Sequence, residues 1–301
     1  MSDIVDYRKI IDENKFDNEH LFNFIYSGTI ELDLHPQKEH IVSSIAYSDI
    51  KPRVSDFLDE LINTIVDWVY SSKKQHELIN ERLAKNSSQG NAATFLYKLA
   101  RSKFRDGHPQ GQFGELLLCN FLQKFFDSAP LVRKMKISTS SDLERFGADA
   151  IHFGYKNDNP ILYLGEAKCY TSGKFSAAVK NSVNSIFTTF ENIDNELNLY
   201  TYDDFLTDDM EIIAKKYKEN KLENMRYELV CIIIYNESKQ IQSDNENSIR
   251  EEIQRIVVDR CSKLSKDFYS NYDKRTLNRI HYIIFPIWEL QKVLEEYEKK
   301  M

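Results

Sequence analysis

The sequence predicts an α/β protein with a mixed central sheet, in which the core elements follow the order α-β-β-β-α-β. An amphipathic helical pattern over Gln112–Phe126 precedes three strand patterns, which begin at Leu131 and end at Tyr170. A second helical pattern covers Phe175–Ile193. The near-continuous apolar run Tyr227–Tyr235 then predicts a strand that is covered on both faces.

Composition is that of an ordinary globular protein, with 301 residues, of which 42% are hydrophobic and 29% charged. The sequence contains no apolar run of about 18 residues and no signal peptide, so we expect no membrane association. Four widely spaced cysteines without a C-x-x-C pair favour reduced thiols and a cytoplasmic location. A net charge of −7 means that any contact with nucleic acid needs a local basic patch or a partner.

Two regions are expected along the chain. Residues 1–92 form a mostly helical N-terminal accessory region, with a helical pattern over Val54–Lys85, that docks on the core or on a partner. Residues 93–301 form the core domain. After the buried strand, this domain continues with a helix near Ile249–Leu264, a strand over Ile280–Ile287 and a charged helix over Glu289–Lys300.

The stretch from Gly147 to Tyr170 carries the candidate site. It is predicted to form two strands joined by the turn Lys156–Pro160. Glu166 and Lys168 share a face because they lie two residues apart on a strand, and Asp149 can face them from the neighbouring strand. Two half-buried carboxylates repel each other unless a cation neutralises them. Their hard oxygen atoms suit Mg²⁺, with Mn²⁺ as the alternative.

The spacing Glu-x-Lys is common by itself, and the plain alternative is a surface hairpin with an ordinary ion pair. Other such triplets begin at Glu219 and Glu237, within polar stretches. Only the triplet at Glu166 ends a strongly apolar strand that follows a strand beginning Gly-x-Asp. This context favours a catalytic site.

Further candidates surround this hairpin. Glu115 lies at the edge of the apolar stripe of the first core helix, either as a residue favoured by the helix dipole or as a functional acid held against the sheet. Nearby basic side chains could contact phosphate groups or remain solvated on the surface. These are Arg133, Lys134, Lys136, Lys174 and Lys180.

Asp149 followed by Glu166-Ala167-Lys168 resembles the signature of the PD-(D/E)xK nuclease superfamily, whose restriction-endonuclease-like fold has the predicted element order. The segments GQFGELLLCNFL, GADAIHFG, LYLGEAKCY and IHYIIFPI more closely resemble the HamA family, the nuclease subunits of the Hachiman anti-phage defence system. This resemblance extends from about Phe95 to Trp288.

The resemblance implies a metal-dependent DNA endonuclease that is controlled by a superfamily-two helicase, HamB. Asp149 and Glu166 would bind Mg²⁺, the carbonyl of Ala167 would be a further ligand, Lys168 would position or activate water, and Glu115 would support the metal. Asp149 follows Ala148 where the superfamily commonly has Pro. Two alternatives remain: a non-catalytic interaction subunit that retains the fold, and an RNA-cleaving enzyme. No Walker A loop is present, so ATP-driven unwinding would require the partner.

Overall fold

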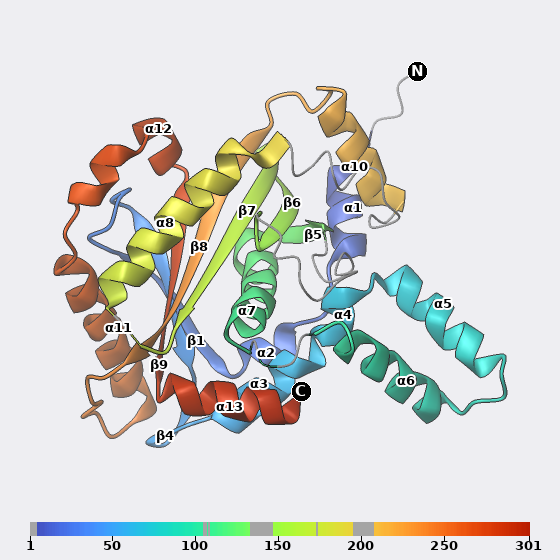
Figure 1. Ribbon diagram of the computed structural model, residues 1–301, viewed down its shortest axis with the longest axis horizontal. Helices are drawn as coiled ribbons and strands as arrows, with labels where there is room; N and C mark the ends of the chain where they lie inside the picture. The colour runs from blue at the N-terminus through green and yellow to red at the C-terminus, as the bar shows by residue number, and fades with distance from the viewer. Residues whose placement is uncertain (1–4, 105–106, 108, 133–146, 173, 195–207) are drawn as a thin grey trace.

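The computed structural model describes residues 5–104, 107, 109–132, 147–172, 174–194 and 208–301. Its centre is a seven-stranded mixed sheet of order β1-β2-β9-β8-β7-β6-β5 (Figure 1). The strands are β1 (Ile25–Glu31), β2 (Glu39–Ile45), β5 (Ser128–Val132), β6 (Ala150–Lys156), β7 (Asn159–Tyr170), β8 (Arg226–Glu237) and β9 (Ile280–Trp288). Strands β7, β8, β9 and β2 are parallel, whereas β5, β6 and β1 pair antiparallel with their neighbours.

Helices cover both faces of this sheet. They are α1 (Tyr7–Asn14), α2 (Glu19–Phe22), α3 (Val54–Asn63), α4 (Ile65–Val69), α5 (Ser72–Leu83), α6 (Gln89–Arg101), α7 (Pro109–Phe126), α8 (Phe175–Glu191), α10 (Asp208–Lys218), α11 (Glu246–Ser262), α12 (Lys274–Leu277) and α13 (Leu290–Lys300). The short strands β3 (Tyr47–Ser48) and β4 (Lys51–Pro52) form a separate pair. The order α7-β5-β6-β7-α8-β8 confirms the predicted core, with α10 inserted before β8. No helix within the described ranges is long and apolar enough to cross a membrane.

Strand β8 separates two hydrophobic cores, as its apolar sequence predicted. Val230, Ile232 and Ile234 pack with α3, α7 and α13 on one face. Leu229, Cys231 and Ile233 alternate with them and pack with α8 on the other face. All six side chains are fully buried, so α7 and α8 cover opposite faces of the sheet.

The hairpin of β6 and β7 has the predicted turn. Asn157 and Asp158 adopt positive φ angles of 50° and 59°, which match the two-residue turn that joins twisted antiparallel strands. The ladder closes at Lys156 opposite Asn159 and runs back to Ala150 opposite Gly165. This register determines which side chains of the candidate site face each other.

Strand β5 begins earlier than expected. The predicted first strand covered Leu131–Thr139, whereas the observed strand starts at Ser128, directly after the end of α7. Residues 133–139 lie outside the described part of the chain. The β5–β6 ladder shifts register between Pro130 and Val132, so the alternation of side chains is interrupted there.

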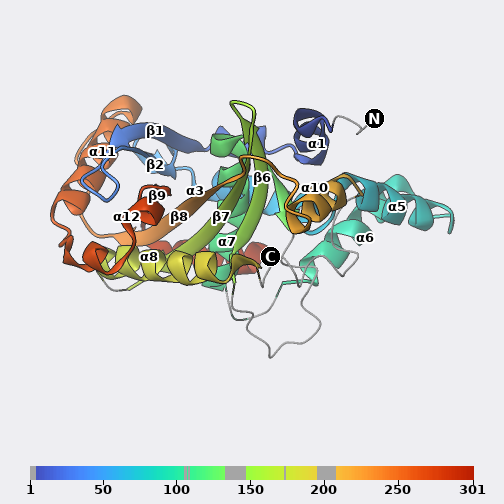
Figure 2. The ribbon, with the colours of Figure 1, turned by 90° about the horizontal axis from the view of Figure 1, so that it is seen from above.

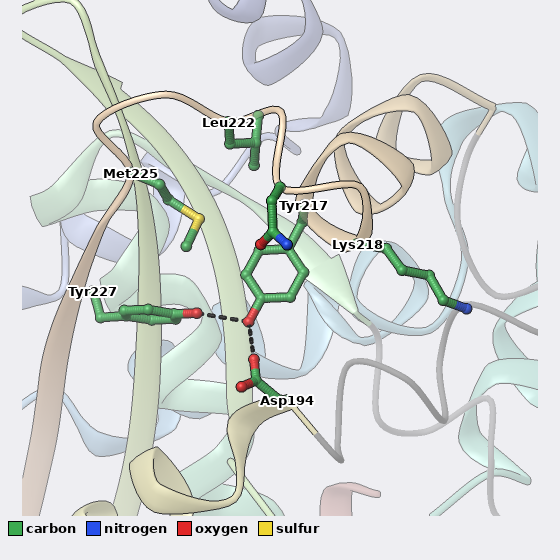
Figure 3. A pocket seen from close by; sticks show the side chains of 7 residues that line it. Asp194, Tyr217, Lys218, Leu222, Met225 and Tyr227 are labelled. Carbon is green, nitrogen blue, oxygen red and sulfur yellow. Dashed lines mark hydrogen bonds between the residues drawn. The ribbon is translucent and has the colours of Figure 1, made fainter.

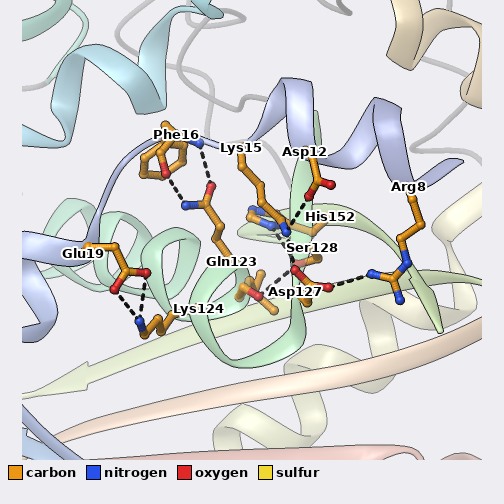
Figure 4. A network of polar contacts seen from close by, with 11 residues as sticks. Arg8, Asp12, Lys15, Phe16, Glu19, Gln123, Lys124, Asp127, Ser128 and His152 are labelled. Carbon is orange, nitrogen blue, oxygen red and sulfur yellow. Dashed lines mark hydrogen bonds and ion pairs between the residues drawn. The ribbon is translucent and has the colours of Figure 1, made fainter.

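The N-terminal region contributes directly to the central sheet. Strand β2 pairs in parallel with β9, through Ile41 opposite Ile283 and Val42 opposite Ile284. Helix α1 and the residues after it are also tied to the end of α7 by a polar network (Figure 4). The predicted N-terminal region, residues 1–92, therefore shares its sheet with residues 93–301.

In this network, Asp127 accepts from Arg8 at 2.6 Å and from Lys15, while Lys124 pairs with Glu19 at 2.7 Å. These contacts join charged side chains that are partly solvated, so each one adds little stability. Their arrangement along one segment nevertheless holds α1 beside β5 and β6.

Candidate active site

Asp149 and Glu166 lie side by side on the face of the sheet that α8 covers. The backbone N–H of Asp149 donates to the carbonyl of Gly165 at 2.9 Å, and the ladder continues with Ala150 opposite Gly165. Directly opposed residues of antiparallel strands project to the same face. The carboxylate of Asp149 is oriented by the backbone N–H of Ala167, which donates to its Oδ2 at 2.8 Å.

Glu166 is a buried carboxyl group with two polar partners. Its Oε1 accepts a hydrogen bond from the hydroxyl of Ser185 on α8 at 2.8 Å and pairs with the Nζ of Lys168 at 2.6 Å. Burial, followed by the charge of Asp149, raises the pKa of Glu166 to about 7, although Lys168 and Ser185 act in the opposite direction. The site therefore has an excess of negative charge that a cation would relieve.

Lys168 keeps its positive charge in this environment. Burial alone would lower the pKa of its ammonium group, but Glu166, Asp149 and Tyr170 together raise it above its ordinary value. Glu166 is almost completely enclosed, whereas the Lys168 side chain is partly accessible to solvent. A ligand that approaches from solvent can therefore reach the ammonium group of Lys168, whereas the carboxylate of Glu166 lies buried beneath it.

Burial distinguishes this Glu-x-Lys triplet from the one at Glu219. Both triplets contain an ion pair of 2.6 Å, between Lys168 and Glu166 and between Lys221 and Glu219. The side chain of Glu166 is 3% exposed, however, whereas that of Glu219 is 38% exposed. Desolvation strengthens electrostatic effects, so the same spacing has different chemical consequences in the two places.

The triplet at Glu237 differs from its expected polar setting. Glu237 ends β8 and is 2% exposed, so this carboxylate is buried although its triplet stands in a polar stretch of the sequence. Its partner is Arg260 on α11, whose Nε donates at 3.0 Å, and the N–H groups of Ser238 and Lys239 donate to it at 2.8 Å. This carboxylate is neutralised by Arg260, and the contact holds α11 against the end of β8.

Glu115 lies on α7, across the sheet from Glu166. Helix α7 contacts β7 where a Cβ at Gly114 would come within 3.2 Å of the Ala167 side chain, and Ala167 points away from the α8 face. Glu115 is close enough to Tyr297 on α13 to add to the effect of burial in raising the pKa of that phenol. Among the described residues, no three His, Cys, Asp or Glu side chains gather to hold a metal ion. Glu115 therefore does not complete a three-carboxylate cluster with Asp149 and Glu166.

The predicted basic residues divide into two groups. Lys174 directly precedes α8, and Lys180 lies on the outer side of this helix; both are exposed and follow the end of β7. The other three, Arg133, Lys134 and Lys136, lie outside the described residues.

Sequence reasoning missed Ser185. This hydroxyl interrupts the inward-facing stripe of α8 one turn after buried Ser182, and a polar residue within such a stripe is a signal that a polar partner lies opposite.

Two neighbouring carboxylates provide a donor set that fits Mg²⁺ or Mn²⁺. Such ions commonly use one or two carboxylates and keep several waters, so a third carboxylate is not required. The raised pKa of Glu166 reflects repulsion and burial that a bound cation would offset. The N–H of Ala167 already orients Asp149, and its carbonyl stays a predicted ligand.

A separate cavity of about 460 Å³ lies at the beginning of β8 (Figure 3). Its lining includes Met225 and Leu222, and the hydroxyl of Tyr217 bonds to Asp194 and, at 2.6 Å, to Tyr227. Tyr227 pairs with Leu162, four residues before Glu166 on β7, and the cavity shares no lining residue with the carboxylate site. Asp194, Tyr217 and Tyr227 thus hydrogen-bond to one another within its lining.

Comparison with known proteins identifies the family. The chain matches the family model described as HamA over residues 19–301, a span that contains Asp149, Glu166, Lys168 and all seven strands of the sheet. A search of curated proteins finds no match. Because the family match covers nearly the whole chain, this protein belongs to the HamA family of Hachiman defence proteins.

Proposed function

We propose that this protein is a metal-dependent endonuclease that hydrolyses phosphodiester bonds of DNA within an anti-phage defence complex. The observation that carries the proposal is the pairing of Asp149 and Glu166 on one face of the sheet, with the Lys168 ammonium 2.6 Å from Glu166. Membership of the HamA family supports the defence role.

Asp149 and Glu166 would hold Mg²⁺, with Mn²⁺ as the alternative and the Ala167 carbonyl as a further ligand. A bound ion of this kind polarises a phosphate and lowers the pKa of its water. The protein supplies orientation: the Ala167 N–H holds Asp149, and the Ser185 hydroxyl holds Glu166. Carboxylates held in this way need little rearrangement before the reaction.

Lys168 would act on the reacting groups. Its charged ammonium neutralises Glu166 in this structure, and its side chain is 28% exposed, against 3% for that of Glu166. Once a cation neutralises Glu166, the ammonium is available to hold the attacking water or a phosphate oxygen. Exposed Lys174 and Lys180 would contact neighbouring phosphates, and Glu115 would support the site from the other face of the sheet.

The partner that we propose is a superfamily-two helicase resembling HamB. The net charge of −7 fits a subunit whose partner supplies part of the DNA-binding surface. Control by the partner would restrain cleavage until the complex meets its target.

The test is cleavage of plasmid DNA by the purified protein in Mg²⁺, with EDTA as the metal-free control, with and without the helicase. Lys168→Ala should lower the rate by about a hundredfold or more, because a preorganised charge is lost. Lys221→Ala is the matched control, since it breaks a Glu-x-Lys ion pair of the same 2.6 Å length at an exposed position. This control should cleave like the wild type.

Each alternative has its own outcome. Full activity of Lys168→Ala would remove the proposed catalytic role of this lysine. Cleavage of RNA but not of plasmid would establish the RNA-cleaving enzyme. A folded wild-type protein that joins the helicase but cuts neither substrate would establish the non-catalytic subunit.

A further inference from the structure

Helices α5 and α6 form a hairpin that projects from the body of the protein, as both views show (Figures 1 and 2). No side chain of α5 is fully buried, whereas Ala92, Leu96 and Ala100 of α6 are. The hairpin therefore rests on the body through α6 and presents most of its surface to solvent.

The charge of this hairpin is opposite to that of the rest of the chain. Residues 71–104 contain seven Lys or Arg and two Asp or Glu, a net charge of +5. The whole chain has 40 basic and 47 acidic residues, which leaves 33 against 45, or −12, outside the hairpin. A concentration of positive charge on a projecting element of an acidic protein is the electrostatic pattern of a phosphate-binding surface.

The positive charges are accessible on α6. Lys98 and Arg101 are both exposed and lie three residues apart, so they share a face of the helix, and Lys85 is exposed in the turn before it. Within the part of the chain that the structure describes, none of the three forms an ion pair. On α5, by contrast, Glu77 is already paired with Lys74 at 3.0 Å.

The surface suits DNA better than an acidic protein. Protein interfaces have an apolar centre, whereas protein–DNA interfaces are polar and strongly basic. The large hydrophobic side chains exposed among the described residues are Ile50, Ile212 and Val258, and all three lie outside the hairpin. The large hydrophobic side chains of the hairpin are buried or half-buried, so its exposed surface is dominated by charged and polar groups.

The hairpin directly precedes the helix that contacts the end of β7. Helix α6 leads through residues 102–108 into α7, and Gln110 in the first turn of α7 donates to the hydroxyl of Thr171 at 2.9 Å. Thr171 directly follows β7, the strand of Glu166 and Lys168. This hydrogen bond joins the start of α7, the next helix after the hairpin, to the end of that strand.

We infer that the exposed face of α6, with Lys98 and Arg101, and the adjoining Lys85 bind the phosphate backbone of duplex DNA and hold it for cleavage. The inference rests on the proposed nuclease function for its purpose, but the binding itself is independent of cleavage. Contacts to the phosphate backbone carry no sequence information, so we expect the affinity for duplex DNA not to depend on its base sequence.

The test is binding of a fluorescein-labelled DNA duplex to the full-length protein in EDTA, followed by anisotropy over a series of KCl concentrations. The double variant Lys98→Gln/Arg101→Gln should reduce the steepness of the plot of log affinity against log salt concentration by about 1.8. This corresponds to a loss of about sixtyfold in affinity near 0.1 M salt, relative to 1 M salt. Lys274→Gln/Arg275→Gln is the matched control, because it removes one exposed Lys and one exposed Arg from α12 at the opposite end of the molecule (Figure 1). This control should keep the wild-type slope.

Equal slopes for the two double variants would overturn the inference, and so would a wild-type protein that does not bind duplex DNA at low salt. Loss of association with the partner subunit without a change in the DNA slope would assign the hairpin to a protein contact instead. Binding that depends on the hairpin, combined with no cleavage in Mg²⁺, would refute the nuclease proposal and leave the hairpin assignment intact.

Discussion

Replacing Glu166 by Gln should remove the free-energy cost of ionising a buried carboxyl group, which destabilises the folded protein as the pH rises through neutrality. Burial and the charge of Asp149 raise the pKa of Glu166 from 4.5 to about 7. Between these values the unfolded chain has lost the proton while the folded protein keeps it, so the free energy of unfolding falls as the pH rises. This difference in the pKa of Glu166 between the folded and unfolded states lowers the free energy of unfolding by about 3 kcal/mol. The whole loss is present above pH 7, and none of it is present below pH 4.5.

The measurement is urea unfolding of the metal-free protein, followed by circular dichroism at about pH 5 and about pH 8. Between these conditions, the wild type should lose about 2–3 kcal/mol more stability than Glu166→Gln, which has no proton to release. Glu219→Gln is the control, because Glu219 is exposed and its pKa is lowered by Lys221, so its titration lies below this range. Equal pH dependence in the wild type and Glu166→Gln would refute the reasoning.

Two further predictions concern the metal and the packing of the sheet. Millimolar Mg²⁺ at about pH 8 should raise the Tm of the wild type in scanning fluorimetry but not that of Asp149→Asn, with NaCl of equal ionic strength as the control; an equal rise in both would place the ion elsewhere. Gly165→Ala should lower the free energy of unfolding by about 1–3 kcal/mol, because the new Cβ would lie 2.8 Å from Leu118 Cδ2 and 3.1 Å from Leu122 Cδ1. Gly111→Ala, where a Cβ meets nothing within 4 Å, should not destabilise the protein in the same urea titration, and similar losses in both variants would contradict the packing argument.

The elements that the sequence predicted well are those determined by local patterns. The turn of the β6–β7 hairpin was visible as Asn157 and Asp158 between two apolar runs, and both residues have the positive φ that this turn requires. Strand β8 covers the predicted run Tyr227–Tyr235 and extends it by one residue before and two after. The shared face of Glu166 and Lys168 likewise follows from the period of a strand.

The features that the sequence did not reveal depend on contacts between distant segments. Nothing in the local pattern indicates that Ile41 pairs with Ile283, so β1 and β2 were not expected to extend the central sheet. The face of the sheet that α7 covers is also decided by tertiary packing, and it places Glu115 opposite Glu166. The burial of Glu237 depends similarly on Arg260, 23 residues further along the chain.

The position of β9 has a consequence for the synthesis of the protein. This strand is the last of the sheet to leave the ribosome, yet it lies between β2 and β8. Until residues 280–288 emerge, β8 has an unpaired edge and the β1–β2 hairpin has no neighbour, so the nascent sheet remains in two parts. For the proposed nuclease, the sheet that supports Asp149, Glu166 and Lys168 could therefore close only after residues 280–288 have been synthesised.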